Sequence, residues 1–300
     1  MTTTAFFLIL FSAGLHASWN LLAKKSHMTF AFYTTMMIVD MLMGAWVLFV
    51  LPVRLAELSP AFYLATWGAA LGETIYCTGL VMSYRRMDMS AAYPMMRSLP
   101  LLFTAMLTHL LGFGKPLSLL ALIGMATVFA GCVVMPLGKF SDFRLSNYWN
   151  KTIAFVLLAA LGTTVYTICD SEAQGAMRAC APQVSGTMVS CTYYELRHIA
   201  VVAALGLVVL AVPSARAEAA AVPRNGLGTP LLAGVFAGLT YILVLLAMNY
   251  VTNVTYVQML RLLALPMGLL TGIFVLKEKG APPKFVGVAL ILAGLILAAI

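Results

Sequence analysis

Charged residues are scarce in this chain of 300 residues: they make up 9% of it, whereas 62% of its residues are apolar. A typical soluble domain is about half apolar and about a quarter charged. A globule of this size has too little interior to bury the excess apolar surface, and a chain so rich in apolar residues does not have the composition of a disordered protein either. We therefore expect the lipid bilayer, and not water, to be the solvent of this fold.

Motifs that indicate an enzyme or a cofactor are also missing. The sequence contains no HExxH, GxSxG, Walker A or GxGxxG motif, so we expect neither an enzyme nor a cofactor. A Glu-x-x-His spacing at Glu195 and His198 occurs in di-iron bundles, but here it stands alone and predicts no metal site. The cysteines are odd in number and include no Cys-x-x-Cys pair, which argues against a disulfide framework or a zinc site. They are Cys77, Cys132, Cys169, Cys180 and Cys191.

The net charge of +8 arises from 18 Lys and Arg against 10 Asp and Glu. The basic residues are single or paired between apolar segments and form no run interleaved with aromatic residues, so nucleic acid is not an expected partner. We interpret them as a signal of membrane topology, with the lipid bilayer and a small-molecule substrate as the expected partners.

Ten apolar stretches have the length of a membrane-spanning helix, which is about 17–25 residues. Proline and glycine mark the breaks between them, and the longest polar breaks lie near 139–151 and 212–228. We therefore predict an all-α polytopic membrane protein with ten transmembrane helices and no soluble domain. The stretches lie near 4–23, 29–51, 61–84, 90–112, 117–136, 152–171, 184–211, 229–249, 254–276 and 283–300.

The two halves of the chain carry similar features in the same order. Arg97 lies 18 residues before Lys115, and Arg261 lies 18 residues before Lys279. Each segment is followed by an apolar helix that ends in Ala-Gly. We interpret the chain as two copies of one five-helix unit.

Each unit has five spans, and this odd number fixes the orientation of the second copy in the membrane. That copy must enter the membrane from the opposite side, so the two are inverted repeats, an architecture typical of secondary transporters. We predict a first repeat at 1–138, a connecting loop at 139–151 and a second repeat at 152–300. Twelve of the 18 Lys and Arg fall in odd-numbered loops and three in even-numbered loops. The positive-inside rule then places the odd loops in the cytoplasm and both termini outside.

Particular segments resemble a known family. The first span reads Leu15-His-Ala-Ser-Trp-Asn-Leu-Leu-Ala-Lys24, and Lys277-Glu278-Lys279 precedes the last helix. With the five-plus-five layout, these features resemble the EamA-type drug/metabolite transporter superfamily, although Lys115 stands where that family usually has Glu. The resemblance implies secondary transport of small metabolites through a central cavity. We expect a multi-pass protein of the inner or plasma membrane that is a monomer or a homodimer.

Ionisable side chains within the predicted spans are candidates for the site, because each costs at least about 2.5–3.5 kcal/mol on insertion scales. Arg97 and Arg261 are equivalent in the two halves, and the planar fork of Arg suits carboxylate or phosphate. We expect both to face a midplane cavity and to bind an anionic or zwitterionic solute, such as an amino acid, an organic acid or a phosphonate. The alternative is that each only pairs with a carboxylate of the protein, Arg97 with Glu73 and Arg261 with Asp170 or Glu195. The other expected substrate-binding residues are Tyr93, Tyr256, Gln258, Trp19, His16, Asn20 and Tyr76.

Glu73 and Glu195 are the candidates for proton coupling. Glu73 follows Gly72, in a stretch of small residues where helices approach closely. Its alternative role is a permanent ion pair with an arginine. We expect Asp40 to brace two helices and Asp170 to lie near a helix end. A rival function is export of cationic or neutral drug-like compounds, with a carboxylate as the cation site; an intramembrane enzyme is a more distant alternative.

Overall fold

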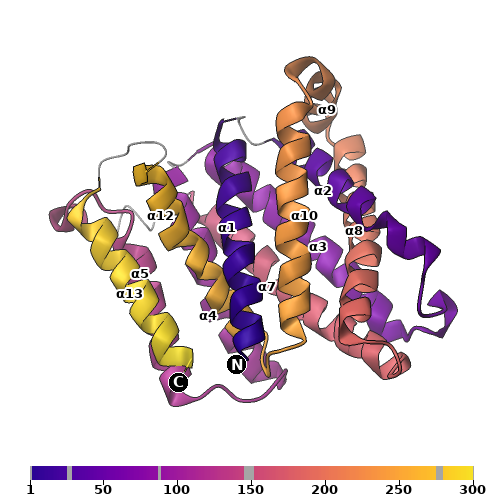
Figure 1. The fold of residues 1–300 in the computed structure, drawn as a ribbon. Helices are drawn as coiled ribbons and strands as arrows, with labels where there is room; N and C mark the ends of the chain where they lie inside the picture. Colours follow the sequence, from indigo (N-terminus) through magenta and orange to yellow (C-terminus); the bar gives the residue numbers. More distant parts are fainter. Residues whose placement is uncertain (1, 26–28, 87–88, 145–151, 275–279, 300) are drawn as a thin grey trace.

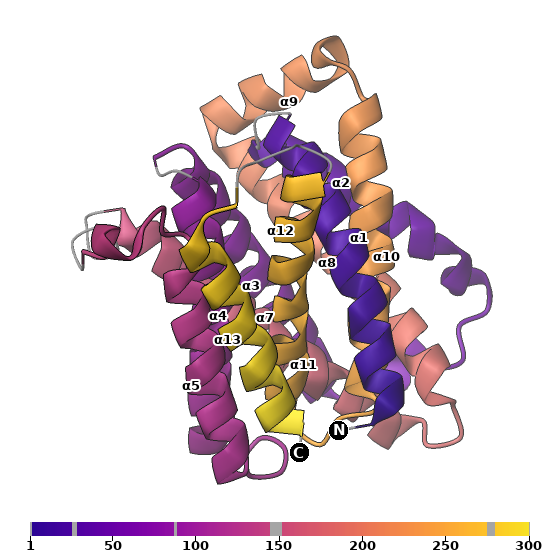
Figure 2. The ribbon, with the colours of Figure 1, turned by 60° about the vertical axis from the view of Figure 1, so that its left-hand side comes forward.

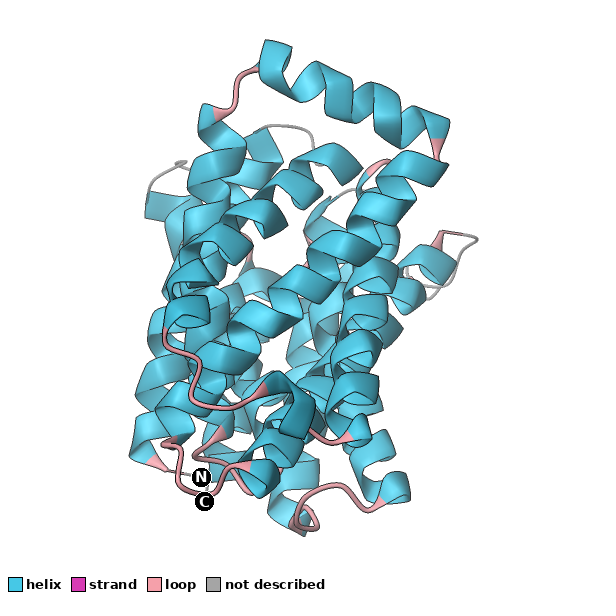
Figure 3. Ribbon diagram, turned by 90° about the vertical axis from the view of Figure 1, so that its right-hand side faces the viewer, coloured by secondary structure: helices cyan, strands magenta, loops and turns pink. Residues whose placement is uncertain are grey.

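The structure is a computed structural model that describes residues 2–25, 29–86, 89–144, 152–274 and 280–299. All regular secondary structure within these ranges is helical, which confirms the all-α prediction (Figure 3). The α-helices are α1 (Thr3–Lys25), α2 (Phe30–Gly44), α3 (Pro60–Tyr84), α4 (Met89–Leu111), α5 (Leu119–Val134), α7 (Ile153–Cys180), α8 (Gly186–Ala211), α9 (Pro213–Asn225), α10 (Gly228–Met248), α11 (Thr255–Leu260), α12 (Ala264–Phe274) and α13 (Pro282–Ala299). Short 3₁₀ helices include η1 (Ala45–Phe49), η2 (Leu55–Glu57), η3 (Phe140–Asp142) and η4 (Arg261–Leu263).

Helices occupy all ten predicted apolar stretches. Within the residues that the structure describes, four of these helices are long and apolar enough to cross a membrane. The stretch predicted at 254–276 is not one continuous helix, because η4 separates α11 from α12. Pro266 explains the break: it has no N–H to donate to the carbonyl of Leu262, so the preceding turn tightens to a 3₁₀ geometry. The four helices are Phe30–Phe49, Ile153–Cys180, Gly186–Ala211 and Gly228–Met248.

Two boundaries differ from those expected. The break near 212–228 contains α9, which begins at Pro213 and ends at Asn225, and Gly226 follows it with a φ of 92°. Its alanines favour a helix, and proline is well tolerated in the first helical turn. Helix α7 runs to Cys180, well past the expected end near residue 171. Asp170 therefore lies inside a helix, and the expectation that it lies near a helix end is wrong.

Some segments used in the sequence argument lie outside the described residues. The expected connecting loop at 139–151 is described as far as residue 144. The Lys277-Glu278-Lys279 segment lies outside the described ranges, as does the side chain of Lys24. The repeat pattern is therefore traced through the helices and not through these loops.

Three pairs of helices pack along each other: α3 with α7, α5 with α13, and α1 with α10 (Figures 1 and 2). Glycine allows two of these close approaches. A Cβ added to Gly162 of α7 would lie 2.6 Å from the carbonyl oxygen of Gly72 on α3, and one added to Gly131 of α5 would lie 2.6 Å from that of Gly287 on α13. Small residues at such crossings let backbones approach closely, as is common between membrane helices.

The distribution of apolar and charged side chains is the reverse of that in a soluble protein. Large apolar side chains point outward, including Phe11, Leu64 and Leu119, which are 67%, 78% and 73% exposed. Charged side chains such as Arg197 and Asp170 are buried instead. An apolar surface around a charged interior suits a protein surrounded by lipid.

Both termini lie at the same end of the bundle, and α9 lies across the opposite end (Figures 1 and 3). At the end with the termini, the loop after α4 contacts the loop after α10. The N–H of Lys115 donates to the carbonyl of Thr252 at 2.9 Å, and the Asn253 side chain donates to the carbonyl of Lys115 at 3.0 Å. Nearby, the hydroxyls of Thr108 and Thr255 lie 3.2 Å apart. We call these five residues the terminal clasp.

Candidate functional site

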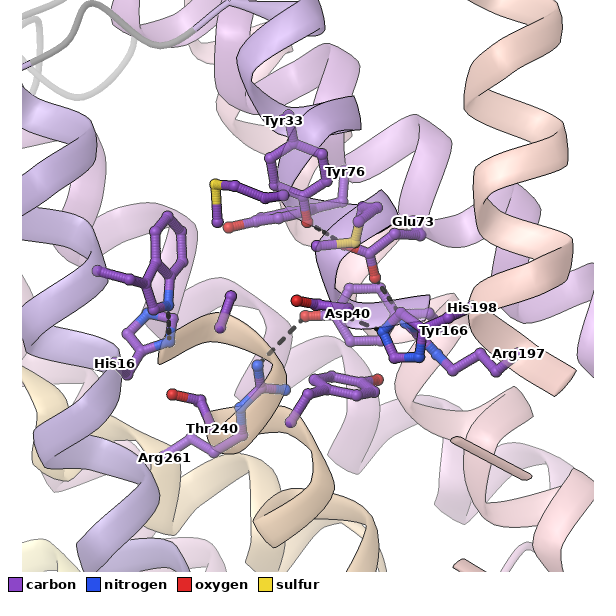
Figure 4. A pocket seen from close by; sticks show the side chains of 15 residues that line it. His16, Tyr33, Asp40, Glu73, Tyr76, Tyr166, Arg197, His198, Thr240 and Arg261 are labelled. Atoms are coloured by element: carbon purple, nitrogen blue, oxygen red, sulfur yellow. Dashed lines mark hydrogen bonds and ion pairs between the residues drawn. The ribbon is translucent and has the colours of Figure 1, made fainter. Parts of the chain in front are cut away.

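A cavity of about 40 Å³ lies where α1, α2, α3, α7, α8, α10 and η4 meet (Figure 4). Each of these elements contributes at least one side chain, so the cavity draws on both halves of the sequence. Its lining combines aromatic rings with charged groups. It is formed by His16, Trp19, Tyr33, Met36, Met37, Asp40, Glu73, Tyr76, Tyr166, Arg197, His198, Ala237, Thr240, Tyr241 and Arg261.

Arg197 of α8 lies at the centre of a buried ion network. Its Nη2 donates to Oε2 of Glu73 at 2.6 Å, and its Nε donates to Oδ1 of Asp170 at 3.0 Å. All three side chains are at most 6% exposed. Two carboxylates therefore surround one guanidinium group, and Coulomb attraction repays part of the large cost of burying them.

Tyrosine hydroxyls complete the hydrogen bonding of these carboxylates. Tyr33 donates to Oε1 of Glu73. Tyr193 donates to Oδ1 of Asp170 at 2.6 Å, and Tyr241 donates to its Oδ2. Every carboxylate oxygen in the network thus has a donor, which is the condition for a stable buried polar group. Glu73 is in the ion pair that was its alternative role, and its partner is Arg197.

Arg261 of η4 has a different environment. Its guanidinium group donates to Oε1 of Gln258 at 3.2 Å and to the hydroxyl of Tyr166 at 3.4 Å. Its Cζ also lies 6.0 Å from the ring centroid of Tyr241, within the range of a cation–π interaction. Among the described residues, no carboxylate oxygen lies within 4.0 Å of this group. Arg261 is thus a buried cation at the cavity wall whose direct partners are neutral.

Arg97 is buried beside the cavity but does not line it. Its Nη2 contacts Nε2 of His16, and the Trp19 indole N–H donates to Nδ1 of the same ring at 3.0 Å. His16 and Trp19 line the cavity, so Arg97 acts on the cavity through His16. The two arginines that are equivalent in the sequence therefore have unequal places in the structure.

The remaining expected residues divide into three sets. Tyr76 lines the cavity, whereas Asn20 donates to the backbone of His16 at 2.7 Å. Tyr256 and the buried Glu195 lie in helices next to the cavity and are not part of its lining. The side chain of Tyr93 lies outside the described part of the structure.

Several lining residues were not among the expected binding residues. The largest group is the stripe of Tyr33, Met36, Met37 and Asp40 on α2. The spacing i, i+3, i+4, i+7 places them on one helical face. This face combines an aromatic ring, two thioethers and a carboxylate, and the pattern is visible in the sequence as a signal of a cavity-lining face. The others are Tyr166, Arg197, His198, Ala237, Thr240 and Tyr241.

Comparison with known proteins gives a fold and no family. No family model matches the chain, and no curated protein matches it. A solved structure described only as the crystal structure of a protein is similar over 99% of this chain and 98% of its own, with a TM-score of 0.66 and 15% sequence identity. At this identity the likeness concerns the fold alone, and it extends over nearly the whole length of both chains.

Proposed function

We propose that the protein is a secondary active transporter that moves a small anionic or zwitterionic metabolite across a membrane by alternating access. The observation that carries the proposal is the central cavity, in which Arg261 is a buried cation without a carboxylate partner among the described residues. The EamA-type resemblance of the sequence agrees with this function. Residence in the inner or plasma membrane, with the termini outside, is part of the proposal.

The ten-span inverted repeat belongs to the proposal as well, and the helix packing supports it. An exchange of the two repeats would replace α1 by α7, α2 by α8 and α3 by α10. The contact of α1 with α10 then becomes that of α7 with α3, and the contact of α2 with α10 becomes that of α8 with α3. The contacts of α2 with α8 and of α5 with α13 map onto themselves. A pattern that is unchanged by this exchange is expected of two related units.

The same packing supports a proposal for which parts move. Helix α10 packs on both α1 and α2, and these three helices form a first group; α3, α7 and α8 contact one another and form a second. Each group combines helices of both repeats, and the cavity lies between the groups. We therefore infer that the two groups, and not the two repeats, move as bodies during alternating access.

The first step of the test is a binding screen on the purified protein in detergent. Glycine, succinate, methylphosphonate and tetraphenylphosphonium represent zwitterionic, dicarboxylate, phosphonate and cationic solutes. A solute that binds the folded protein raises its melting temperature by mass action. We expect one of the anionic or zwitterionic probes to do so, and its radiolabelled form to exchange across proteoliposomes.

Substitution of Arg261 is the second step. Arg261→Ala should weaken binding by at least about 30-fold, because a hydrogen bond to a charged group is worth about 2 kcal/mol or more. Arg261→Lys keeps the charge but not the planar fork, so it should recover part of the affinity. The control is Arg54→Ala, since the Arg54 side chain is 86% exposed. If Arg261→Ala binds and exchanges the solute like the wild type, or if only tetraphenylphosphonium binds, the proposal is wrong.

A further inference from the structure

We propose that Asp40 and His198 form a proton site that couples proton binding to the movement of the two helix groups. The inference rests on the transport function proposed above and assigns proton coupling to this pair, not to Glu73 or Glu195. Nε2 of His198 lies 3.5 Å from Oδ2 of Asp40, both residues are 1% exposed, and both line the cavity (Figure 4).

The hydrogen bond on the far side of the ring fixes the tautomer of His198. Its Nδ1 lies 2.6 Å from the backbone carbonyl oxygen of Tyr194. A carbonyl oxygen only accepts, so Nδ1 must carry a hydrogen. In a neutral ring Nε2 is then an acceptor, and it faces a carboxylate oxygen that is also an acceptor. A proton between them, held as imidazolium with carboxylate or as imidazole with carboxylic acid, removes this conflict.

Two other buried carboxylates, those of Glu73 and Asp170, have no comparable freedom. Glu73 and Asp170 each bind Arg197 and a tyrosine hydroxyl through both of their oxygens. Protonation of either would break a buried ion pair, which is strongly destabilising. Oδ1 of Asp40, by contrast, has no hydrogen-bond partner among the described residues. Among the carboxylates that line the cavity in the described residues, Asp40 is therefore the one whose protonation breaks no ion pair with arginine; Glu195 also lacks a partner at Oε2, but it does not line the cavity.

Charged and titratable groups of four elements act on the pair. Arg197 on α8 is a nearby cation, and Glu73 on α3 and Asp170 on α7 are the carboxylates. Two aromatic groups lie against the imidazole: the ring of Tyr194 at 4.2 Å between centroids, and that of Tyr241 on α10 at 6.0 Å. Glu73 and Asp170 oppose the effect of Arg197 on the charge of His198.

The position of the pair links its proton to conformation. Asp40 lies on α2 in the first helix group, and His198 lies on α8 in the second. Loss of the proton to cavity water leaves a net charge of −1 and two acceptors facing each other across the boundary between the groups. That repulsion favours separation of the groups at this point, and proton binding favours their contact.

The test measures proton binding without any solute, so that it does not depend on the transported metabolite. Proteoliposomes on a solid-supported membrane are exposed to a jump from alkaline to mildly acidic buffer, and the displaced charge is recorded. The wild type should give a transient current that Asp40→Asn and His198→Gln lose. The matched control is His109→Gln, which removes an exposed histidine of α4 and should leave the current unchanged.

Both substitutions are chosen so that the variant proteins still fold. The amide of Asn at position 40 can donate to Nε2, and the amide of Gln at position 198 can donate to the carboxylate, so each replaces the proton by a fixed hydrogen bond. A second readout needs no variant at the pair: in ¹⁵N NMR of the histidine rings, His198 should keep Nδ1 protonated at every pH. A wild-type current that persists in both variants, or a neutral His198 protonated at Nε2, overturns the inference. Absence of solute binding by the wild type would instead overturn the proposed transport function.

Discussion

Arg197 and Arg261 show how two buried arginines in one cavity can serve different purposes. Arg197 is held by two carboxylates whose oxygens are all hydrogen-bonded, so its charge is compensated within the protein. Arg261 is held by an amide and a hydroxyl, so its direct partners leave its charge uncompensated. The first arrangement fixes the helices that carry it, and the second suits the anion binding that we propose for Arg261.

Glu73 is expected to act on stability through this network. Glu73→Gln removes one of the two charges that face Arg197 and should destabilise the fold by about 3 kcal/mol, near the lower end of the range for a broken buried ion pair, because Asp170 remains. The measurement is reversible unfolding in mixed micelles. Glu57→Gln, at an exposed ion pair of 3.6 Å, should change stability by less than about 1 kcal/mol. Equal stabilities of the two variants would contradict this role of Glu73.

The sequence predicted which residues are polar inside the bundle, because each such residue needs a partner or a wet cavity. It did not predict the partners. Glu73 was considered as a partner of Arg97, whereas the structure pairs it with Arg197. The choice depends on which faces of α3, α4 and α8 meet, and this is set by the packing of the whole bundle and not by local spacing.

At the scale of the helices, glycine decides where pairs come close. Gly72 and Gly162 lie at the crossing of α3 with α7, where any side chain would meet backbone atoms of the other helix. The equivalent contacts of α5 with α13 use Gly124 and Gly131. These crossings bring the backbones of α3 and α7, and those of α5 and α13, into direct contact.

Gly162→Ala should therefore cost about 1–3 kcal/mol, as overpacking of a close contact does. Its added Cβ would lie 2.6 Å from the carbonyl oxygen of Gly72 and 2.8 Å from Cα of Tyr76. Gly206→Ala is the matched control, because an added Cβ there meets nothing within 4 Å. Alanine at this helical position should be neutral or stabilise by up to about 1 kcal/mol. Equal unfolding free energies for the two variants would mean that the α3–α7 crossing is not tightly packed.

Helix positions were largely predictable, because hydropathy and the proline and glycine breaks act locally. The prediction was wrong where composition conflicted with propensity. The polarity of 212–228 suggested a loop, but its alanines form α9. The C-terminal end of α7 and the break at η4 also escaped, since the first is stabilised by hydrogen bonds that join Asp170 and Gln174 to α8 and the second depends on one proline.

At the scale of the whole molecule, the terminal clasp joins the two groups of helices at the end that holds the termini. Helix α4 packs on α7 of the second group, and α11 with η4 packs on α1 of the first. Thr108 and Thr255 therefore join elements that must separate if the cavity is to open at this end. The repeat order in the sequence suggested two halves, but it could not show that the helix groups for which we propose movement each combine helices of both.

Alternating access between the two helix groups is tested most directly by a reversible crosslink across the terminal clasp. The hydroxyl oxygens of Thr108 and Thr255 lie 3.2 Å apart. Sulfurs in their place need only a small shift to reach the disulfide length of about 2.05 Å. In proteoliposomes loaded with the solute found by the binding screen, oxidation of the Thr108→Cys, Thr255→Cys variant should stop exchange, and dithiothreitol should restore it. Neither single variant should respond. Exchange at the wild-type rate by the fully crosslinked protein would contradict alternating access between these helix groups.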